Sequence, residues 1–537
     1  EPQLHTHMVG STAVRGVDGK WSRVYSRALY GEARTAAAKS HAVFRALTHE
    51  QLGWEWEPVD IGRGTAEVAG ISPERIASLS TRTKEIDAKL AEVVALETAV
   101  WGEAPSDAAI RAMRQRITLD TRKTKHQESH ATPAVIDAWR EQLDTETGLS
   151  QEQRQASYRA AWTDIAAGGD VPALDGVALT VEGAAMEGRA SSTEAWIRAT
   201  AWKLVPPSTP YADMERVHAE LVETAKAEFV ALTPPEAVQT GYLTENLALF
   251  TSRAELDLEH GAVQTVEATR EHAAGVVGVV PLLRVIHGKD AEGRRLDDEQ
   301  QAAVAHLCSA GLVKTMEARA GAGKTFTLAQ ATRAWQSQDQ LVVVLGNAAD
   351  TSRVAATEIA AATGGTRPES MTLAAFHGRG KTGMGQRAQS IRAQLVEAAK
   401  GPGAVVILDE AGTAGNRDFA DLVAFAAEHG VAVRAVGDRY QQSAIDAGGL
   451  WAYIATREGV GVELEEVRRF HDPREAELSK RLAAGDPSVW AEYLDMGRIH
   501  IVADSEHAIA AAAETVASAR AAGKDALAIS RSNTDRV

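Results

Sequence analysis

Residues 318–325 read ARAGAGKT, and this stretch decides the fold of the second half of the chain. A Val-containing run over 311–317 precedes it, and a helical pattern over 326–335 follows it. We therefore expect a strand, a tight loop and a helix, which is the context of a phosphate-binding loop. Ala318 stands where the usual motif has its first glycine, and an alanine fits there if its φ is negative.

Five residues of this loop are candidate nucleotide ligands. Gly321, Ala322 and Gly323 would let backbone N–H groups close around the β- and γ-phosphates at the N-terminus of the helix. Lys324 would bridge the phosphates, and the hydroxyl of Thr325 would hold Mg²⁺. The alternative, an ordinary glycine-rich turn, does not explain Gly-Lys-Thr at this offset between a strand and a helix.

Two later segments also end apolar runs in polar side chains. The run over 405–408 leads directly into Asp409 and Glu410. At the carboxyl end of a strand, Asp409 would orient Mg²⁺ and Glu410 would act as the general base for water, although the pair could also cap the next helix. After the run over 431–436, the pattern Gly-Asp-x-x-Gln would place the Gln441 amide near the γ-phosphate, where it could sense hydrolysis; without the two earlier motifs the same pattern would not indicate this role. We expect these runs to be strands of a parallel sheet, because helical patterns separate them.

Composition and charge limit the class of protein. The chain has 537 residues, of which 45% are apolar, 24% charged and 5% aromatic, and its net charge is −16. This composition fits a soluble chain of about three to four domains and excludes a globally basic, DNA-coating protein. The only cysteine, Cys308, excludes an internal disulfide and a multi-cysteine zinc site, and it fits a reducing cytoplasm.

The texture of the sequence changes along the chain and suggests four regions. Residues 1–95 carry strand-like and turn segments, and 96–290 are dominated by helical patterns. An α/β lobe with the phosphate-binding loop is expected over 291–458, followed by a fourth region over 459–537. The predicted fold class is therefore α/β, preceded by a helical region and an α+β N-terminal part.

The first residues, EPQLHTH, contain His5 and His7. In a strand, residues two apart face the same side, so both imidazoles could contact one divalent cation. Two ligands are not a complete site, and two ordinary strand histidines are the alternative. The first 50 residues hold seven Lys/Arg against four Asp/Glu, so this end is locally basic.

The order of motifs after residue 295 resembles that of superfamily-one helicases. LDDEQ, ending at Gln300, resembles the Q motif, in which a glutamine reads adenine. Residues 346–351 resemble segment Ia and residues 372–377 segment Ib, and in that superfamily both line the channel for single-stranded DNA. LEEVRRF resembles motif IV, which implies that Arg469, with Arg468 as a second choice, reaches the γ-phosphate. The stretch 296–537 is similar to the RecD-like branch, which implies ATP, Mg²⁺ and 5′-to-3′ movement. The resemblance also implies that 291–458 is a RecA-like helicase lobe, 1A, and that 459–537 is the start of the second lobe, 2A.

Residues 1–95 resemble the C-terminal part of the relaxase domain, of the α+β HUH type, of MobF-type conjugative relaxase–helicases such as the TrwC group. The resemblance rests on the histidine opening, on DGKW ending at Trp21, on GWEW ending at Trp56 and on AEVAGI ending at Ile71. It implies that His5 and His7 are two of three ligands to a divalent metal. The third histidine and the nucleophilic tyrosine precede this pair in the family, and Tyr25 and Tyr30 do not match that tyrosine.

The two resemblances together imply an ATP-dependent DNA helicase fused to a DNA-nicking relaxase of conjugative plasmid transfer. The implied partners are single-stranded DNA, plasmid transfer-origin DNA, a conjugative coupling protein and accessory proteins, without a membrane span. We expect a cytoplasmic protein and an internal piece of a longer chain. The alternatives are a stand-alone RecD-like repair helicase and a fragment that binds ATP and DNA without turnover.

Overall fold

A computed structural model describes most of the chain. The described residues are 13–16, 19–23, 26–60, 65–71, 81–101, 110, 113–114, 116–118, 133, 137–138, 140–141, 144–145, 148–166, 174–239, 247–290, 293–319, 321–379, 385–439, 441, 447–466, 470, 472–524 and 526–528.

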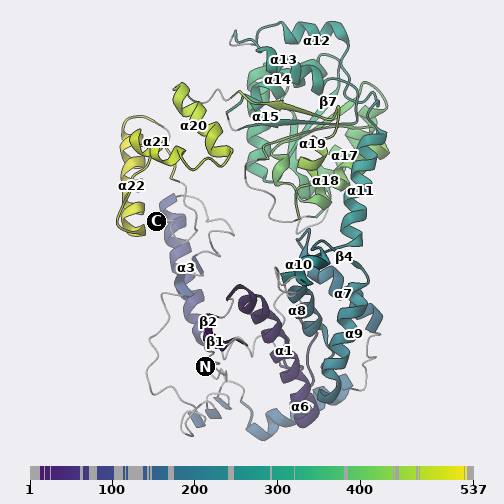
Figure 1. Cartoon of the computed structure of the whole chain (residues 1–537), viewed down its shortest axis with the longest axis vertical. Coiled ribbons are helices and arrows are strands. Elements are labelled where there is room, and N and C mark those ends of the chain that lie inside the picture. The colour runs from purple at the N-terminus through teal and green to yellow at the C-terminus, as the bar shows by residue number, and fades with distance from the viewer. Residues whose placement is uncertain are drawn as a thin grey trace.

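The second half of the chain forms a six-stranded parallel sheet with helices on both faces (Figure 1). The strand order is β11-β6-β10-β9-β7-β8. The strands are β6 (Val313–Ala318), β7 (Leu341–Gly346), β8 (Glu369–Thr372), β9 (Ala404–Leu408), β10 (Ala432–Gly437) and β11 (Gly461–Leu464). The helices around them are α11 (Arg253–Ala268), α12 (Val279–Ile286), α13 (Asp298–Leu307), α14 (Lys324–Gln336), α15 (Ala349–Thr363), α16 (Leu373–Phe376), α17 (Gln386–Ala399), η3 (Ala411–Thr413), α18 (Asn416–His429) and α19 (Leu450–Ala455).

Continuous apolar runs make these strands because both faces of the sheet are covered. Along β9, Val406 and Leu408 pack into a core with α17 and α18, whereas Val405 and Ile407 pack into a second core with α13 and α14. The alternation is that of a strand, in which successive side chains point to opposite faces. The expected RecA-like sheet is therefore present, and its carboxyl edge carries the polar residues that follow β6, β9 and β10.

The sheet lobe extends beyond the expected limits of 291 and 458 on both sides. Val263 and Val266 of α11 and Val285 of α12 are buried in its two cores, so the packed lobe begins before residue 291. Strand β11 pairs in parallel with β6, so the sheet ends at Leu464 and not at residue 458. A strand of four residues is too short to be assigned to a sheet from its own sequence.

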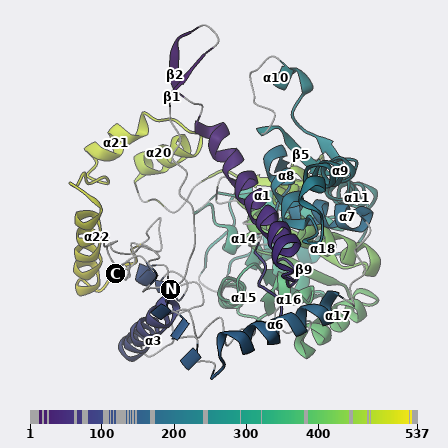
Figure 2. The same ribbon diagram turned by 90° about the horizontal axis from the view of Figure 1, so that it is seen from below.

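A second unit consists of helices and a small antiparallel sheet of order β3-β5-β4. Its elements are α1 (Ser26–Leu52), α7 (Leu174–Met186), β3 (Ser192–Thr193), α8 (Glu194–Leu204), η1 (Tyr211–Asp213), α9 (Met214–Lys226), β4 (Phe229–Ala231), α10 (Pro235–Gln239) and β5 (Leu249–Ser252). Ala38, Ala42 and Ala46 of α1 share one core with Ile197 and Trp202 of α8. Figure 2 shows the two helices side by side. Residues on both sides of the expected boundary at 95 therefore pack in one unit, because small side chains let the helices approach closely.

The remaining described elements belong neither to the sheet lobe nor to the helical unit. They are the hairpin of β1 (Ala13–Arg15) and β2 (Trp21–Arg23), then α3 (Thr81–Trp101), α6 (Gln151–Ala166), α20 (Pro473–Ala483), α21 (Val489–Asp495) and α22 (Ser505–Ala521). The last three, yellow in Figure 1, lie apart from the sheet lobe. In the part of the chain that the structure describes, no helix is long and apolar enough to cross a membrane.

Candidate active site

The predicted phosphate-binding loop lies between β6 and α14, as its sequence indicates. Gly321 and Gly323 have φ values of +86° and +89°, a region that favours glycine. Gly323 is the N-cap of α14, so the first N–H groups of the helix, which have no partner within it, are available to an anion. Ala318 ends β6 as a buried strand residue, so an alanine fits the first position of the motif.

Lys324 joins the loop to the acidic pair after β9. Its Nζ lies 2.5 Å from Glu410 Oε1 and 2.9 Å from Asp409 Oδ1. Burial by itself lowers the pKa of Lys324, but the two carboxylates outweigh it and hold the pKa above its usual range. The ammonium is thus charged and held at the edge of the sheet where the phosphates of a nucleotide would lie.

The backbone at Glu410 is unusual. Its φ is +52°, and Asp339 is the other non-glycine residue with a positive φ in the described part of the chain. The N–H of Glu410 donates to Asp409 Oδ1 at 3.0 Å, and the hydroxyl of Thr413 donates to the Glu410 carbonyl at 2.8 Å. Such strained conformations concentrate at functional sites, where neighbouring contacts hold a side chain in one place.

The sequence did not indicate a role for Thr413. Its hydroxyl also accepts a hydrogen bond from the side-chain amide of Asn347, which belongs to segment Ia. A chain of two hydrogen bonds therefore connects the segment expected to contact DNA with the backbone of Glu410. Only the three-dimensional structure reveals this connection, because 66 positions separate Asn347 from Thr413.

The residues for a Mg²⁺ ion have suitable chemistry. Thr325 follows Lys324 in the first turn of α14, and the carboxylate of Asp409 contacts Lys324 Nζ. A hydroxyl and a carboxylate are the hard oxygen ligands that Mg²⁺ prefers beside nucleotide phosphates. Within the described residues no group of three His, Cys, Asp or Glu side chains is arranged to hold a metal by itself.

Gln300 lies beside the phosphate-binding loop. A Cβ atom added to Gly323 would lie only 2.5 Å from Gln300 Nε2, so the amide is packed against this glycine. The side chain also completes a capping box at the start of α13: Gln300 Oε1 accepts from the N–H of Asp297 at 3.3 Å. The neighbouring Glu299 accepts from the N–H of Glu465 at 2.6 Å, just before the motif IV arginines.

The other predicted residues stand as follows. Gln441 is exposed, and its Nε2 donates to Asp438 Oδ2 at 3.3 Å; a role toward the γ-phosphate stays a prediction. Arg468, Arg469, His5 and His7 lie outside the described residues.

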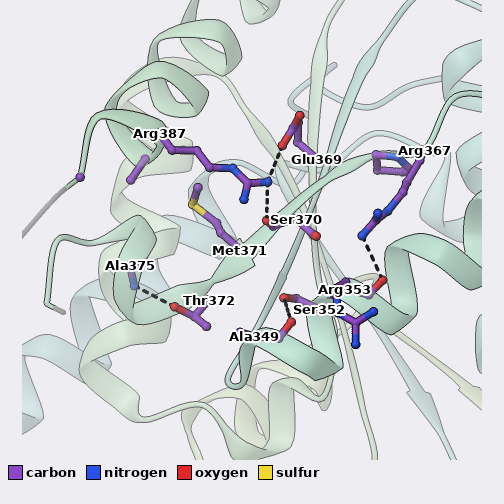
Figure 3. Close-up of a pocket in the computed structure, with 13 residues that line it drawn as sticks. Ala349, Ser352, Arg353, Arg367, Glu369, Ser370, Met371, Thr372, Ala375 and Arg387 are labelled. Carbon is purple, nitrogen blue, oxygen red and sulfur yellow. Dashed lines mark hydrogen bonds and ion pairs between the residues drawn. The ribbon is translucent and has the colours of Figure 1, made fainter. Parts of the chain in front are cut away.

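A groove of about 690 Å³ lies at the β8 edge of the sheet, and its lining includes one residue of segment Ia and two of segment Ib (Figure 3). Arg353, Arg367 and Arg387 line it together with one acidic side chain, Glu369. Arg387 Nη2 lies 2.7 Å from Glu369 Oε2 and donates to the Ser370 carbonyl at 3.2 Å. The lining therefore carries more positive than negative charge, in a chain that is acidic as a whole.

Comparison with protein families identifies two segments. A family model described as "AAA domain" matches residues 295–504, and one described as "TrwC relaxase" matches residues 1–145. The first contains the phosphate-binding loop and the acidic pair, and the second contains His5 and His7.

Similar proteins include two curated relatives and one solved structure. A probable conjugal transfer protein TraA of Sinorhizobium fredii is 32% identical over 192 residues, which are 36% of this chain and 16% of that protein. The conjugal transfer protein TraA of Rhizobium radiobacter is 32% identical over 195 residues, with the same coverage. The crystal structure of the Pif1 helicase from Candida albicans aligns over 40% of this chain and 50% of its own, at 17% identity and a TM-score of 0.27.

The aligned part spans about 16% of the length of these curated relatives. One polypeptide therefore contains a segment that matches the TrwC relaxase model and another that matches the AAA domain model, in agreement with the resemblance to the MobF-type relaxase–helicases.

Proposed function

We propose that this chain is the ATP-hydrolysing part of a relaxase–helicase that moves along single-stranded DNA during conjugative plasmid transfer. The observation that carries the proposal is the contact of Lys324 with Asp409 and Glu410 at the carboxyl edge of the parallel sheet. The AAA and TrwC relaxase matches and the conjugal transfer relatives support it.

The contacts suggest how the site works. An incoming phosphate competes for Lys324, whose ammonium leaves Glu410 for the phosphate oxygens. Glu410, released from its ion pair, then accepts a proton from the attacking water. Bound Mg²⁺ would neutralise phosphate charge, with Thr325 and Asp409 as its protein ligands. Gln300 reads adenine, Gln441 senses the γ-phosphate and Arg469 completes the site when the lobes close.

The groove lined by segments Ia and Ib is our candidate path for single-stranded DNA, because its arginines offer charge to phosphates without reading a sequence. The bonds from Asn347 to Thr413 and from Thr413 to Glu410 would carry the effect of DNA to the ATP site. Movement in the 5′-to-3′ direction belongs to this proposal, as do a cytoplasmic location, transfer-origin DNA, and the coupling and accessory proteins.

Nucleotide binding tests the ATP site directly. We expect calorimetry with Mg²⁺·ATP to detect one site on this chain and Lys324→Ala to lose it. Lys400→Ala is the control, because this exposed lysine pairs with Glu397 on the far end of α17. Equal affinity in the wild type and in Lys324→Ala would refute the site.

The relaxase part of the proposal needs a separate test. His5 and His7 would supply two of three metal ligands, so we expect a chain lengthened at its N-terminus to bind Mn²⁺ or Zn²⁺ in calorimetry. The double variant His5→Ala/His7→Ala of the longer chain should not bind. If neither protein binds metal, the relaxase assignment fails while the ATP site stands. A stand-alone repair helicase, the alternative, would then become the better reading.

A further inference from the structure

Three positively charged side chains surround one tryptophan in the helical unit, far along the chain from the phosphate-binding loop. Arg34 Cζ lies 4.8 Å from the ring centre of Trp196, Arg189 Cζ 4.5 Å and Lys203 Nζ 5.3 Å. All three distances lie within the range of cation–π attraction. The cations come from different elements: α1, the loop between α7 and β3, and α8, which lie in the lower unit of Figure 1.

The negative charge near this cluster is limited. Among the described residues, no ion pair with a carboxylate is found for Arg34 or Arg189, and both arginines are exposed. Asp60 opposes the charge of Lys203, and Glu32 is engaged with Arg198 at 3.6 Å. Burial and the charge of Arg34 lower the pKa of Lys203, as expected where like charges are held together.

The ring of Trp196 holds the cations in place but does not neutralise them. A guanidinium that stacks on an aromatic face keeps its N–H edge available, and that edge matches the geometry of a phosphate. Two such edges and an ammonium on one surface can contact neighbouring phosphates of one strand.

We propose that Arg34, Arg189 and Lys203, held around Trp196, form a binding site for the phosphodiester backbone of single-stranded DNA. The inference rests on the proposed function for its choice of DNA. The site differs from the groove of segments Ia and Ib, since α1, α8 and the loop before β3 belong to the other packed unit. It would hold the strand outside the ATP-binding lobe, at a surface to which the segment that matches the relaxase family contributes Arg34.

The test measures the affinity of this chain for a labelled oligothymidylate by fluorescence anisotropy over a range of salt concentrations. We expect Arg34→Ala/Arg189→Ala to bind more weakly at low salt, with a slope of log K against log[salt] smaller by about 1 to 2, because two phosphate contacts are lost. Calorimetry with ATP should give the wild-type affinity. The double variant Arg216→Ala/Lys400→Ala removes the same charge from exposed sites that pair with carboxylates, and it should keep the wild-type slope.

A charge-preserving variant and a measurement with inorganic phosphate distinguish the possible ligands of this site. Arg34→Lys/Arg189→Lys keeps the charge and should retain most of the slope. It should lose affinity, because lysine lacks the paired N–H donors of a guanidinium. An unchanged slope in Arg34→Ala/Arg189→Ala would overturn the inference while leaving the proposed function intact. If inorganic phosphate raises the melting temperature of the wild type only, and DNA binding is equal in both proteins, the ligand is free phosphate and the DNA assignment is wrong. If the wild type itself binds no oligonucleotide, both proposals fall.

Discussion

At the scale of single residues, the ATP site depends on one lysine that is shared by two carboxylates. Asp409 and Glu410 are adjacent in sequence, yet both reach Lys324 Nζ because the backbone turns into the left-handed region at Glu410. Motif order predicted these three residues. The turn at Glu410 and the hydroxyl of Thr413 that supports it could not be predicted, since neither has a local sequence signal.

Glu410→Gln tests the role of the proposed base. The amide keeps an oxygen for Lys324 but cannot take a proton from water, so we expect kcat for ATP hydrolysis to fall by about 10²- to 10⁴-fold. The dissociation constant for ATP should change little. Steady-state phosphate release and calorimetry measure the two quantities, and exposed Glu397→Gln is the control. A wild-type kcat in Glu410→Gln would assign the base elsewhere.

At the scale of elements, one asparagine joins α11 to α18. Asn416 Nδ2 donates to Glu255 Oε1 at 3.0 Å and to Glu259 Oε1 at 2.6 Å, and Asn416 Oδ1 accepts from the N–H of Leu450 at 3.0 Å. Burial, assisted by the charge of Glu255, raises the pKa of Glu259 above its usual range. The ionised form of Glu259 therefore lowers the free energy of unfolding near neutral pH.

This pKa shift gives a prediction for stability against pH. Because the folded-state pKa is raised, the stabilisation from protonated Glu259 is complete below the unfolded-state pKa and is lost as pH rises through the folded-state value. Glu259→Gln is neutral at every pH and keeps an acceptor for Asn416. We expect its melting temperature to exceed that of the wild type at pH 7 to 8, with a difference that shrinks toward pH 4. Glu358→Gln, on an exposed face of α15, should show no such trend; a lower melting temperature for Glu259→Gln at neutral pH would contradict the argument.

A buried arginine fixes the sheet to the segments around it. Arg434 of β10 is fully buried and donates to carbonyls that include those of Leu307 at 2.5 Å, Gly311 at 3.1 Å and Ala274 at 3.0 Å. Desolvation lowers its pKa to about 10, so the guanidinium stays charged at neutral pH. It joins the end of α13 and the segment before α12 to the centre of the sheet.

Arg434→Met leaves several buried carbonyls without a donor, at about 1–3 kcal/mol for each one that stays unsatisfied. We therefore expect the free energy of opening β10, measured by amide hydrogen exchange, to fall by about 3 kcal/mol or more. Arg216→Met at an exposed site should change it by less than about 0.5 kcal/mol. Unchanged protection of the β10 amides in Arg434→Met would show that the carbonyls find other partners.

At the scale of the whole molecule, local patterns predicted the α/β lobe, whereas long-range packing decided the rest. The loop at 318–325 and the apolar strands carry their own signals, so the lobe and the place of Asp409 were predictable. The pairing of β11 with β6, the core that α1 shares with α8, and the short strands β3, β4 and β5 depend on contacts between distant segments. An arginine inside a central strand gave no local sign that carbonyls of three other segments would surround it.

The same contrast applies to function. The two ends of the chain carry motifs that match a relaxase and an AAA domain. The sequence of the residues between them predicted helices but indicated no function. Trp196, Arg189 and Lys203 lie in that middle part, whereas Arg34 belongs to the segment that matches the relaxase family, 162 positions before Trp196. The proposed second DNA site could be found only after the fold had brought α1 next to α8.

The most direct test of the central claim is steady-state phosphate release from Mg²⁺·ATP with increasing single-stranded DNA. It should be measured for this chain and for a polypeptide that continues beyond Val537. We predict that DNA raises kcat in the longer polypeptide and that Lys324→Ala abolishes hydrolysis with and without DNA. A kcat for ATP hydrolysis that does not change with DNA in the longer polypeptide, or that is retained in Lys324→Ala, would contradict the account.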